Sequence, residues 1–246
     1  MKKVLFATAM AVVALAAAPA LAQGYVGAST TYSKYDSAGS GDHANWYDVY
    51  GGVVAPLSDA YALQFDGDLG WTNSDAATDD TAASGNVHLY RETPNSKLGV
   101  FAGAADVGGT IWNAGVEGQA FLPSSNIGGA IGYVKDDEFD VDGWAAQANG
   151  AVFVTDNFDL YGNLGYASVD GGNVDGWRGG VGAEYQLAST PISFFGEYSH
   201  ADISDWDYKT DNFTVGVTYS WSGTLRERNH RGPSLSGLSG LAGLFH

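Results

Sequence analysis

Charged and amide side chains recur on one side of alternating apolar and polar segments in this sequence. In residues 60–72, Asp66 and Asp68 alternate with Phe65 and Leu69. Because successive side chains of a β-strand point to opposite faces, the acids would share one face of a sheet and the apolar residues the other. A row of acids on a wet face attracts cations, which is the chemistry of an ion-selective passage.

The same alternation gives further candidates for a water-filled interior. In residues 174–187, Trp177, Val181 and Tyr185 oppose Arg178 and Glu184. Glu184 and Glu197 would be diagonal neighbours on adjacent strands. Two like charges at such a short distance are tolerated only when water hydrates them. We expect the lumen-lining residues to include Asp66, Asp68, Glu117, Asp159, Arg178, Glu184 and Glu197.

About twelve such segments follow one another, with 10 to 14 possible, and they predict an all-β fold: one antiparallel transmembrane β-barrel. Most have the roughly 9–11 residues that a tilted strand needs to cross a bilayer. Short turns with breaker residues, such as 56–59 and 94–96, alternate with longer polar loops, such as 73–84 and 202–210. The short turns would face the periplasm and the longer loops the exterior. The predicted strands are 24–35, 44–55, 60–72, 85–93, 97–107, 110–121, 126–135, 142–154, 157–168, 174–187, 191–201 and 211–221.

The two ends of the chain are distinct from this pattern. Residues 1–22 have the charged start, apolar core and Ala-Leu-Ala ending of a cleaved signal peptide, which leaves 23–221 for the barrel. Residues 222–246 contain three arginines and then leucines three positions apart, among Gly and Ser. We expect this tail to be disordered and periplasmic. The alternative is that its arginines bring it into the acidic lumen or against the cell wall.

Aromatic residues are abundant, with 7 Trp, 14 Tyr and 11 Phe. Several Trp residues recur near the starts of alternate strands, about 33 residues apart, where amphipathic rings favour a membrane interface. The predicted interface girdle comprises Trp46, Trp112, Trp144, Trp177, Tyr219 and Trp221. A soluble β-sandwich with these rings in its core is the competing interpretation.

Composition excludes several classes of function. The formal net charge of −17 repels nucleic acid, so no DNA or RNA partner is expected. The absence of cysteine excludes disulfides and cysteine metal sites. The spacing of Asp136, Asp137, Glu138, Asp140 and Asp142 does not match an EF-hand loop, so we predict neither a metal nor another cofactor.

Residues 24–221 resemble the porin-like outer-membrane β-barrel proteins of Gram-negative bacteria. The resemblance depends on the export site at 20–22, on hairpins such as 177–198, and on the alternating aromatic strand from Phe213 to Trp221. It implies an outer-membrane location, contact with lipid and lipopolysaccharide, and reading of the last strand by the barrel-insertion machinery. Relatives are often trimers, so a homo-oligomer is possible. Members usually end at the final aromatic of that strand, whereas this chain continues for the length of the tail.

The resemblance implies passive passage of small hydrophilic solutes or ions, and the acidic interior favours cations. The alternative is a non-conducting structural or adhesive barrel that acts through its external loops. A lipid hydrolase ranks third, because His88 and His200 do not combine with Ser and Asn in a convincing catalytic set. We therefore expect no enzyme activity and name no catalytic residue.

Overall fold

The computed structural model describes residues 23–37, 40–73, 81–106, 108–137, 140–170, 174–204, 208–221 and 223–244. The predicted signal peptide lies outside these residues. Twelve strands account for most of the described chain. Their bounds are β1 Gln23–Ser37, β2 Ser40–Pro56, β3 Tyr61–Asn73, β4 Thr81–Thr93, β5 Ser96–Asp106, β6 Thr110–Leu122, β7 Ser125–Asp136, β8 Val141–Thr155, β9 Phe158–Asp170, β10 Val174–Gln186, β11 Ile192–Ile203 and β12 Tyr208–Ser220.

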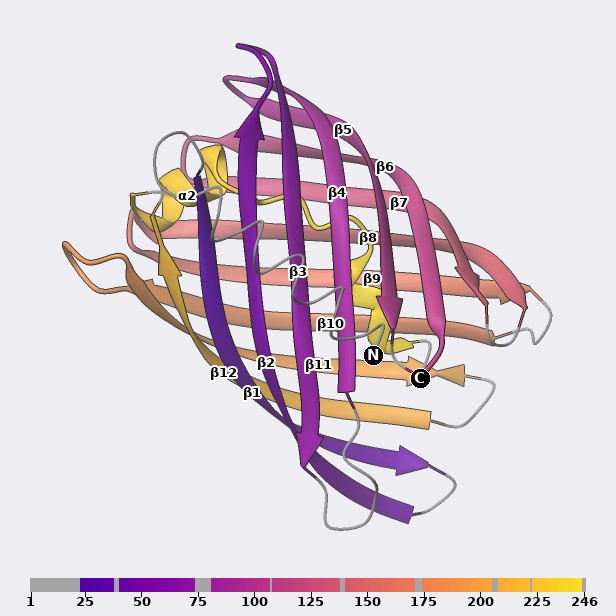
Figure 1. Ribbon diagram of the computed structural model, residues 1–246. Helices are drawn as coiled ribbons and strands as arrows, with labels where there is room; N and C mark the ends of the chain where they lie inside the picture. The colour runs from indigo at the N-terminus through magenta and orange to yellow at the C-terminus, as the bar shows by residue number, and fades with distance from the viewer. Residues whose placement is uncertain are drawn as a thin grey trace.

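The strands form a closed antiparallel barrel in which each one pairs with its neighbours in sequence (Figure 1). The sheet closes where β1 meets β12, with Tyr25 opposite Ser220 and Ser37 opposite Tyr208. Closure leaves no free sheet edge, which a bilayer requires because lipid cannot hydrate an unpaired backbone group. The predicted twelve-strand antiparallel barrel is confirmed.

Alternation of side chains gives the barrel an apolar outside. In β12, Phe213, Val215, Val217 and Tyr219 are all exposed, whereas Thr218 between two of them is buried. Outward aliphatic residues on other strands are exposed to an even greater degree, with Leu98 at 70% and Val181 at 65%. In a sandwich these side chains would be inside, so the sheet has the polarity of a membrane barrel.

Strands extend further at one end of the barrel than the sequence indicated. β2 begins at Ser40 and β4 at Thr81, so parts of the expected long loops are strand. At the opposite end the connections are tight, as between Thr93 and Ser96. We call the two ends the loop end and the turn end.

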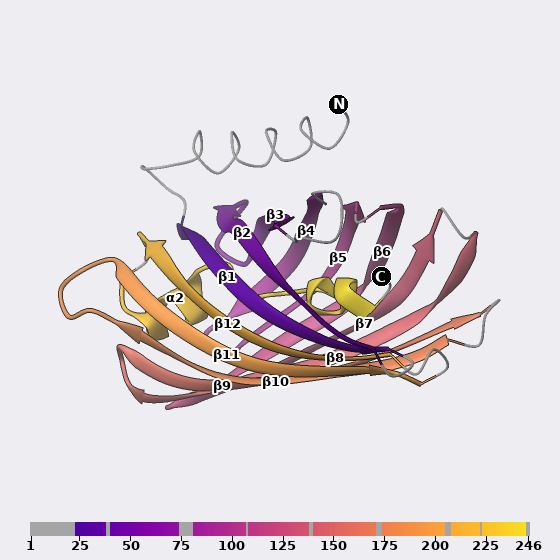
Figure 2. The same cartoon turned by 90° about the horizontal axis from the view of Figure 1, so that it is seen from below.

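Residues 223–244 follow β12 and contain two short helices, α2 (Leu225–Arg231) and the 3₁₀ helix η2 (Ser239–Leu244). Figure 1 shows α2 beside the turn end of β12, and Figure 2 shows the yellow segment running on inside the ring of strands. Within the described chain, neither helix is long and apolar enough to cross a membrane. We refer to residues 223–244 as the C-terminal segment.

Candidate functional site: the barrel lumen

All seven predicted lumen residues have their side chains on the inner face of the sheet. Glu117 and Asp159 are 4% and 5% exposed. Arg178 lies 3.8 Å from Glu197, and Asp68 accepts a hydrogen bond from Ser84. Asp66 and Glu184 make ion pairs of their own. The alternation of the strands was therefore sufficient to place these side chains.

A buried histidine connects two of these acids. His88, on β4, is fully buried, with Nε2 2.7 Å from Asp66 and Nδ1 2.6 Å from Glu117. Nδ1 is hydrogen-bonded to Glu117, whereas the contact of Nε2 with Asp66 is an ion pair only if the ring is protonated. Glu117 also accepts the backbone N–H of Gly237, at 3.1 Å, so the cluster reaches the C-terminal segment. The sequence indicated an inward His88 but gave it no role.

The helix α2 lies against the turn end of the lumen. Thr224 caps it, and the side chains of Thr224 and Glu227 form a reciprocal capping box. Arg228 lies 2.5 Å from Glu184, and both side chains are largely buried. Because Arg228 neutralises Glu184, the proximity of Glu184 to Glu197 does not depend on water alone.

The next stretch of the C-terminal segment is held by side chains of the barrel wall. Lys97 donates to the carbonyl of Gly232 at 2.8 Å and to the hydroxyl of Ser234 at 2.9 Å. The amide of Gln64 pairs with both backbone groups of Leu235, accepting its N–H at 3.2 Å and donating to its carbonyl at 2.5 Å. Lys97 and Gln64 are each 1% exposed, so these bonds are shielded from water.

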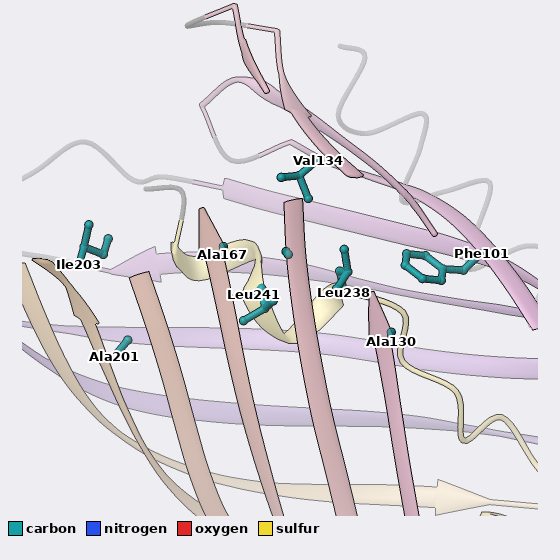
Figure 3. Packing of buried hydrophobic residues seen from close by; sticks show 9 residues of the cluster. Phe101, Ala130, Val134, Ala167, Ala201, Ile203, Leu238 and Leu241 are labelled. Atoms are coloured by element: carbon teal, nitrogen blue, oxygen red, sulfur yellow. The ribbon is translucent and has the colours of Figure 1, made fainter. Parts of the chain in front are cut away.

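Leucines of the C-terminal segment fill the space that small wall residues leave. Leu238 and Leu241 are 3% and 2% exposed and pack in a cluster with Phe101 and several inward alanines (Figure 3). A Cβ on Gly165 would collide with the side chain of Leu241. Leu235 and Leu225 occupy two further clusters nearer the turn end. Burying each leucine contributes roughly 1.5–3 kcal/mol before the entropy of ordering the segment is subtracted.

These contacts correct the expectation of a disordered periplasmic tail. The described part of the tail folds inside the barrel, as the alternative interpretation proposed. Gly and Ser at high density resist independent packing, but here the barrel supplies the core and the hydrogen-bond partners. Gly237 itself adopts a positive φ of 53°, next to Phe101, a conformation that glycine accepts without strain.

Besides a small void of about 20 Å³ at Leu238, three larger cavities lie beside the described C-terminal segment. The first has a volume of about 530 Å³ at the loop end, the second about 350 Å³ in the middle, and the third about 250 Å³ at the turn end. The first and second share Arg178 and Ser239 in their linings. The second and third share Tyr161, Asn229 and Ser234. The cavities therefore follow one another along the lumen.

The predicted aromatic girdle needs one correction. Trp112, Trp144 and Trp177 are 40–48% exposed on the outside near the loop end. Tyr219 and Trp221 have their rings together at the turn end. These five positions agree with an outward girdle, although their contact with lipid stays a prediction.

Trp46 instead lines the loop-end cavity and donates its indole N–H to the hydroxyl of Tyr35, at 2.9 Å. Its neighbour Tyr47 is on the outside, stacked on Trp71. Two successive aromatic residues suit either face of β2, and the pairing with β1 and β3 fixes which of them points outward.

Other potential chemistry is limited in the described residues. His200 bonds Asp211 at 2.9 Å and lies beside the ring of Trp177 on the outer face. Across the described ranges, no group of three or more His, Cys, Asp or Glu could hold a metal ion.

Solved structures show which known proteins share this architecture. An outer-membrane channel from Pseudomonas putida F1 superposes with a TM-score of 0.57 at 12% identity, covering 83% of this chain and 97% of the other. The CymD monoaromatic hydrocarbon channel gives 0.55 at 8% identity, covering 82% and 89%. The KdgM porin in complex with oligogalacturonate gives 0.52 at 10% identity, covering 78% and 99%. No family profile and no curated protein matches the sequence.

At these identities the similarity is one of fold. It agrees with the closed antiparallel sheet and with the apolar outer surface described above. The chain has the fold of the porin-like outer-membrane β-barrel proteins.

Proposed function

We propose that this chain is an outer-membrane channel for small hydrophilic solutes or ions, with a preference for cations and a bore narrowed by its C-terminal segment. The observation that carries the proposal is the succession of three cavities past that segment. A barrel interior that served only as a packed core would be filled to the density of other protein interiors and would not leave three cavities of this size in succession. The proteins with similar folds include two channels and a porin, which supports the same function.

The cation preference rests on the loop-end cavity. Asp48 and Asp68 line it, and their side-chain hydrogen-bond partners among the described residues are the hydroxyls of Ser29 and Ser84. Further along, Glu197 and Glu184 each lie beside an arginine. Arg178 also lines this cavity, but it is paired with Glu197, so Asp48 and Asp68 leave the entrance with net negative charge. Such an entrance concentrates cations and repels anions.

Planar-bilayer recording of the folded chain tests this function. We expect single-channel steps and a cation-to-anion permeability ratio above one. Replacing both entrance acids, Asp48→Asn with Asp68→Asn, should bring the ratio toward one. The matched control, Asp59→Asn with Asp140→Asn, removes two acids outside the lumen and should leave the ratio unchanged. A correctly folded barrel that passes no current, or that prefers anions, contradicts the proposal.

One observation favours a second function. The C-terminal segment is held by hydrogen bonds along its length and buries four leucines, which is also what a permanent plug would show. In that case the barrel would be a non-conducting scaffold acting through its external loops. The recordings separate the two functions, because a scaffold gives no steps under any ionic condition.

The outer surface supports proposals about partners. The exposed aliphatic and aromatic belt would contact lipid and lipopolysaccharide in an outer membrane. The alternating strand β12 would be the segment that the barrel-insertion machinery recognises.

A further inference from the structure

We propose that the middle cavity is a binding site for a neutral polyhydroxylated solute the size of one sugar ring. This inference rests on the proposed channel function and names the class of solute that would pause inside it. The cavity lies between the C-terminal segment and the wall from β6 to β11. Its volume of about 350 Å³ is at the small end of the roughly 300–1,000 Å³ found for ligand sites, so it suits one ring and not a chain of rings.

The lining is rich in groups that both donate and accept hydrogen bonds. Amides come from four neighbouring strands of the wall, β6 to β9, and hydroxyls come from the C-terminal segment. Hydroxyl groups of a solute also donate and accept, so they can match such a lining in many orientations. The lining residues of this kind include Gln147, Asn149, Asn163, Ser234, Ser236 and Ser239.

A fixed cation lines the cavity wall. The terminal nitrogens of Arg178 donate to the carbonyl of Gly240 at 2.9 Å and to the hydroxyl of Ser199 at 3.3 Å. These bonds hold the guanidinium in one position, where its remaining N–H groups can donate to a solute hydroxyl.

Charge in the cavity argues against an ionic ligand. Arg178 and Glu197 carry opposite charges and both line this cavity. Their side chains lie 3.8 Å apart, so the two charges largely neutralise each other. An anion would face Glu197 and a cation would face Arg178 at the same short range. A neutral solute meets neither repulsion and can bond both groups.

The remaining wall is apolar. Leu241, Ala151 and the ring of Tyr161 all line the cavity. A sugar ring presents C–H groups on its faces and hydroxyls at its rim, which matches a site with an apolar wall and polar edges. An ion gains no favourable interaction from the apolar wall, and a hydrocarbon cannot form hydrogen bonds with the amides.

Calorimetric titration of the folded full chain in detergent with D-glucose tests the site without requiring conductance. We expect saturable heat in the millimolar range. Asn163→Leu removes an amide whose side chain lies over the bare backbone of Gly180, and it should weaken binding at least ten-fold. Asn212→Leu is the matched control in the loop-end cavity and should change binding less than two-fold. Asn163→Gln should restore most of the affinity.

Folding of each variant is verified by circular dichroism before titration. A folded wild-type chain that gives no saturable heat, or equal heat for Asn163→Leu, overturns the site, and the cavity then holds water alone. Glucose should also reduce the bilayer current, with half the effect at the calorimetric Kd. Binding without current overturns the channel and leaves the site, whereas current without binding overturns the site and leaves the channel.

Discussion

The guanidinium of Arg228, in the C-terminal segment, lies 2.5 Å from the carboxylate of Glu184 on β10. Breaking a buried ion pair on one side leaves the other charge without compensation, at a cost of about 3–5 kcal/mol. We expect Glu184→Gln to destabilise docking of the C-terminal segment by this amount. The barrel itself should stay folded, because the hydrogen bonds between its strands do not depend on the segment. Tryptic cleavage after Arg226 and Arg231 in the folded barrel should become faster.

The double variant Glu184→Leu with Arg228→Met is the control for this pair. It removes both charges at similar volume, so the segment should regain protection from trypsin. If Glu184→Gln is cleaved no faster than the wild-type chain, the ion pair does not hold the segment.

Removing residues 222–246 should enlarge the pore. The segment occupies the middle of the lumen, and a twelve-stranded barrel lies between the filled 8-stranded and the open 16-stranded types. We expect single-channel conductance to rise roughly two-fold or more, because residues 222–246 no longer take up part of the width of the lumen. Adding the free peptide 223–244 to the truncated barrel should lower the current again. Unchanged conductance after truncation would show that solutes do not pass beside the segment.

Substitution at Gly165 should displace Leu241. A side chain at this position collides with Leu241, and overpacking of this kind costs about 1–3 kcal/mol. The same change at Gly162, on the same strand, meets only ordinary or slightly close contacts with β10 and serves as the control. Because the chain has no cysteine, Ser239→Cys gives a single reporter thiol. Gly165→Val should speed labelling of that thiol, and Gly162→Val should not.

Docking of the C-terminal segment should weaken in acid through His230. Burial lowers the pKa of His230, and Arg226, Lys97 and Arg231 lower it further. The ring stacks on Phe121 with the centroids 4.3 Å apart. A histidine whose pKa falls on docking favours the docked state only while it is neutral. Its contribution is therefore complete above its ordinary pKa of about 6.5 and is lost as the pH falls below that value.

The Ser239→Cys reporter measures this dependence as a labelling rate between pH 7.5 and pH 5. His230→Phe keeps the stacked ring and removes the titration, so its labelling rate should lose this part of the pH dependence. A wild-type rate that is flat over the same range contradicts the assignment.

Alternation in the strands made much of the barrel predictable from sequence. Residues 213–221 fix the facing of β12, since every outward position is large and apolar. In β2 the neighbours Trp46 and Tyr47 suit either face, so the outcome depended on pairing with β1 and β3. The seven inward polar residues followed from parity alone, because a strand leaves each side chain only two directions.

The partners of those residues were not predictable in the same way. His88 meets Asp66 and Glu117 from different strands, and the distances depend on register. Leu238 and Leu241 can pack against the wall because Ala145, Ala167 and Gly165 are small and leave room for their side chains. The regular leucine spacing is visible in the sequence of the tail. That sequence alone does not show that the barrel wall leaves space for those side chains.

The anchors of the C-terminal segment lie on β3, β5, β6, β8 and β10, strands that become one enclosure only when β1 meets β12. The full set of partners therefore surrounds the segment only when the wall is complete. We expect assembly to end with an insertion event in which the closed cylinder receives its own last residues from the turn end. Time-resolved refolding should accordingly pass through a species with all its strand signal and a still-reactive tail.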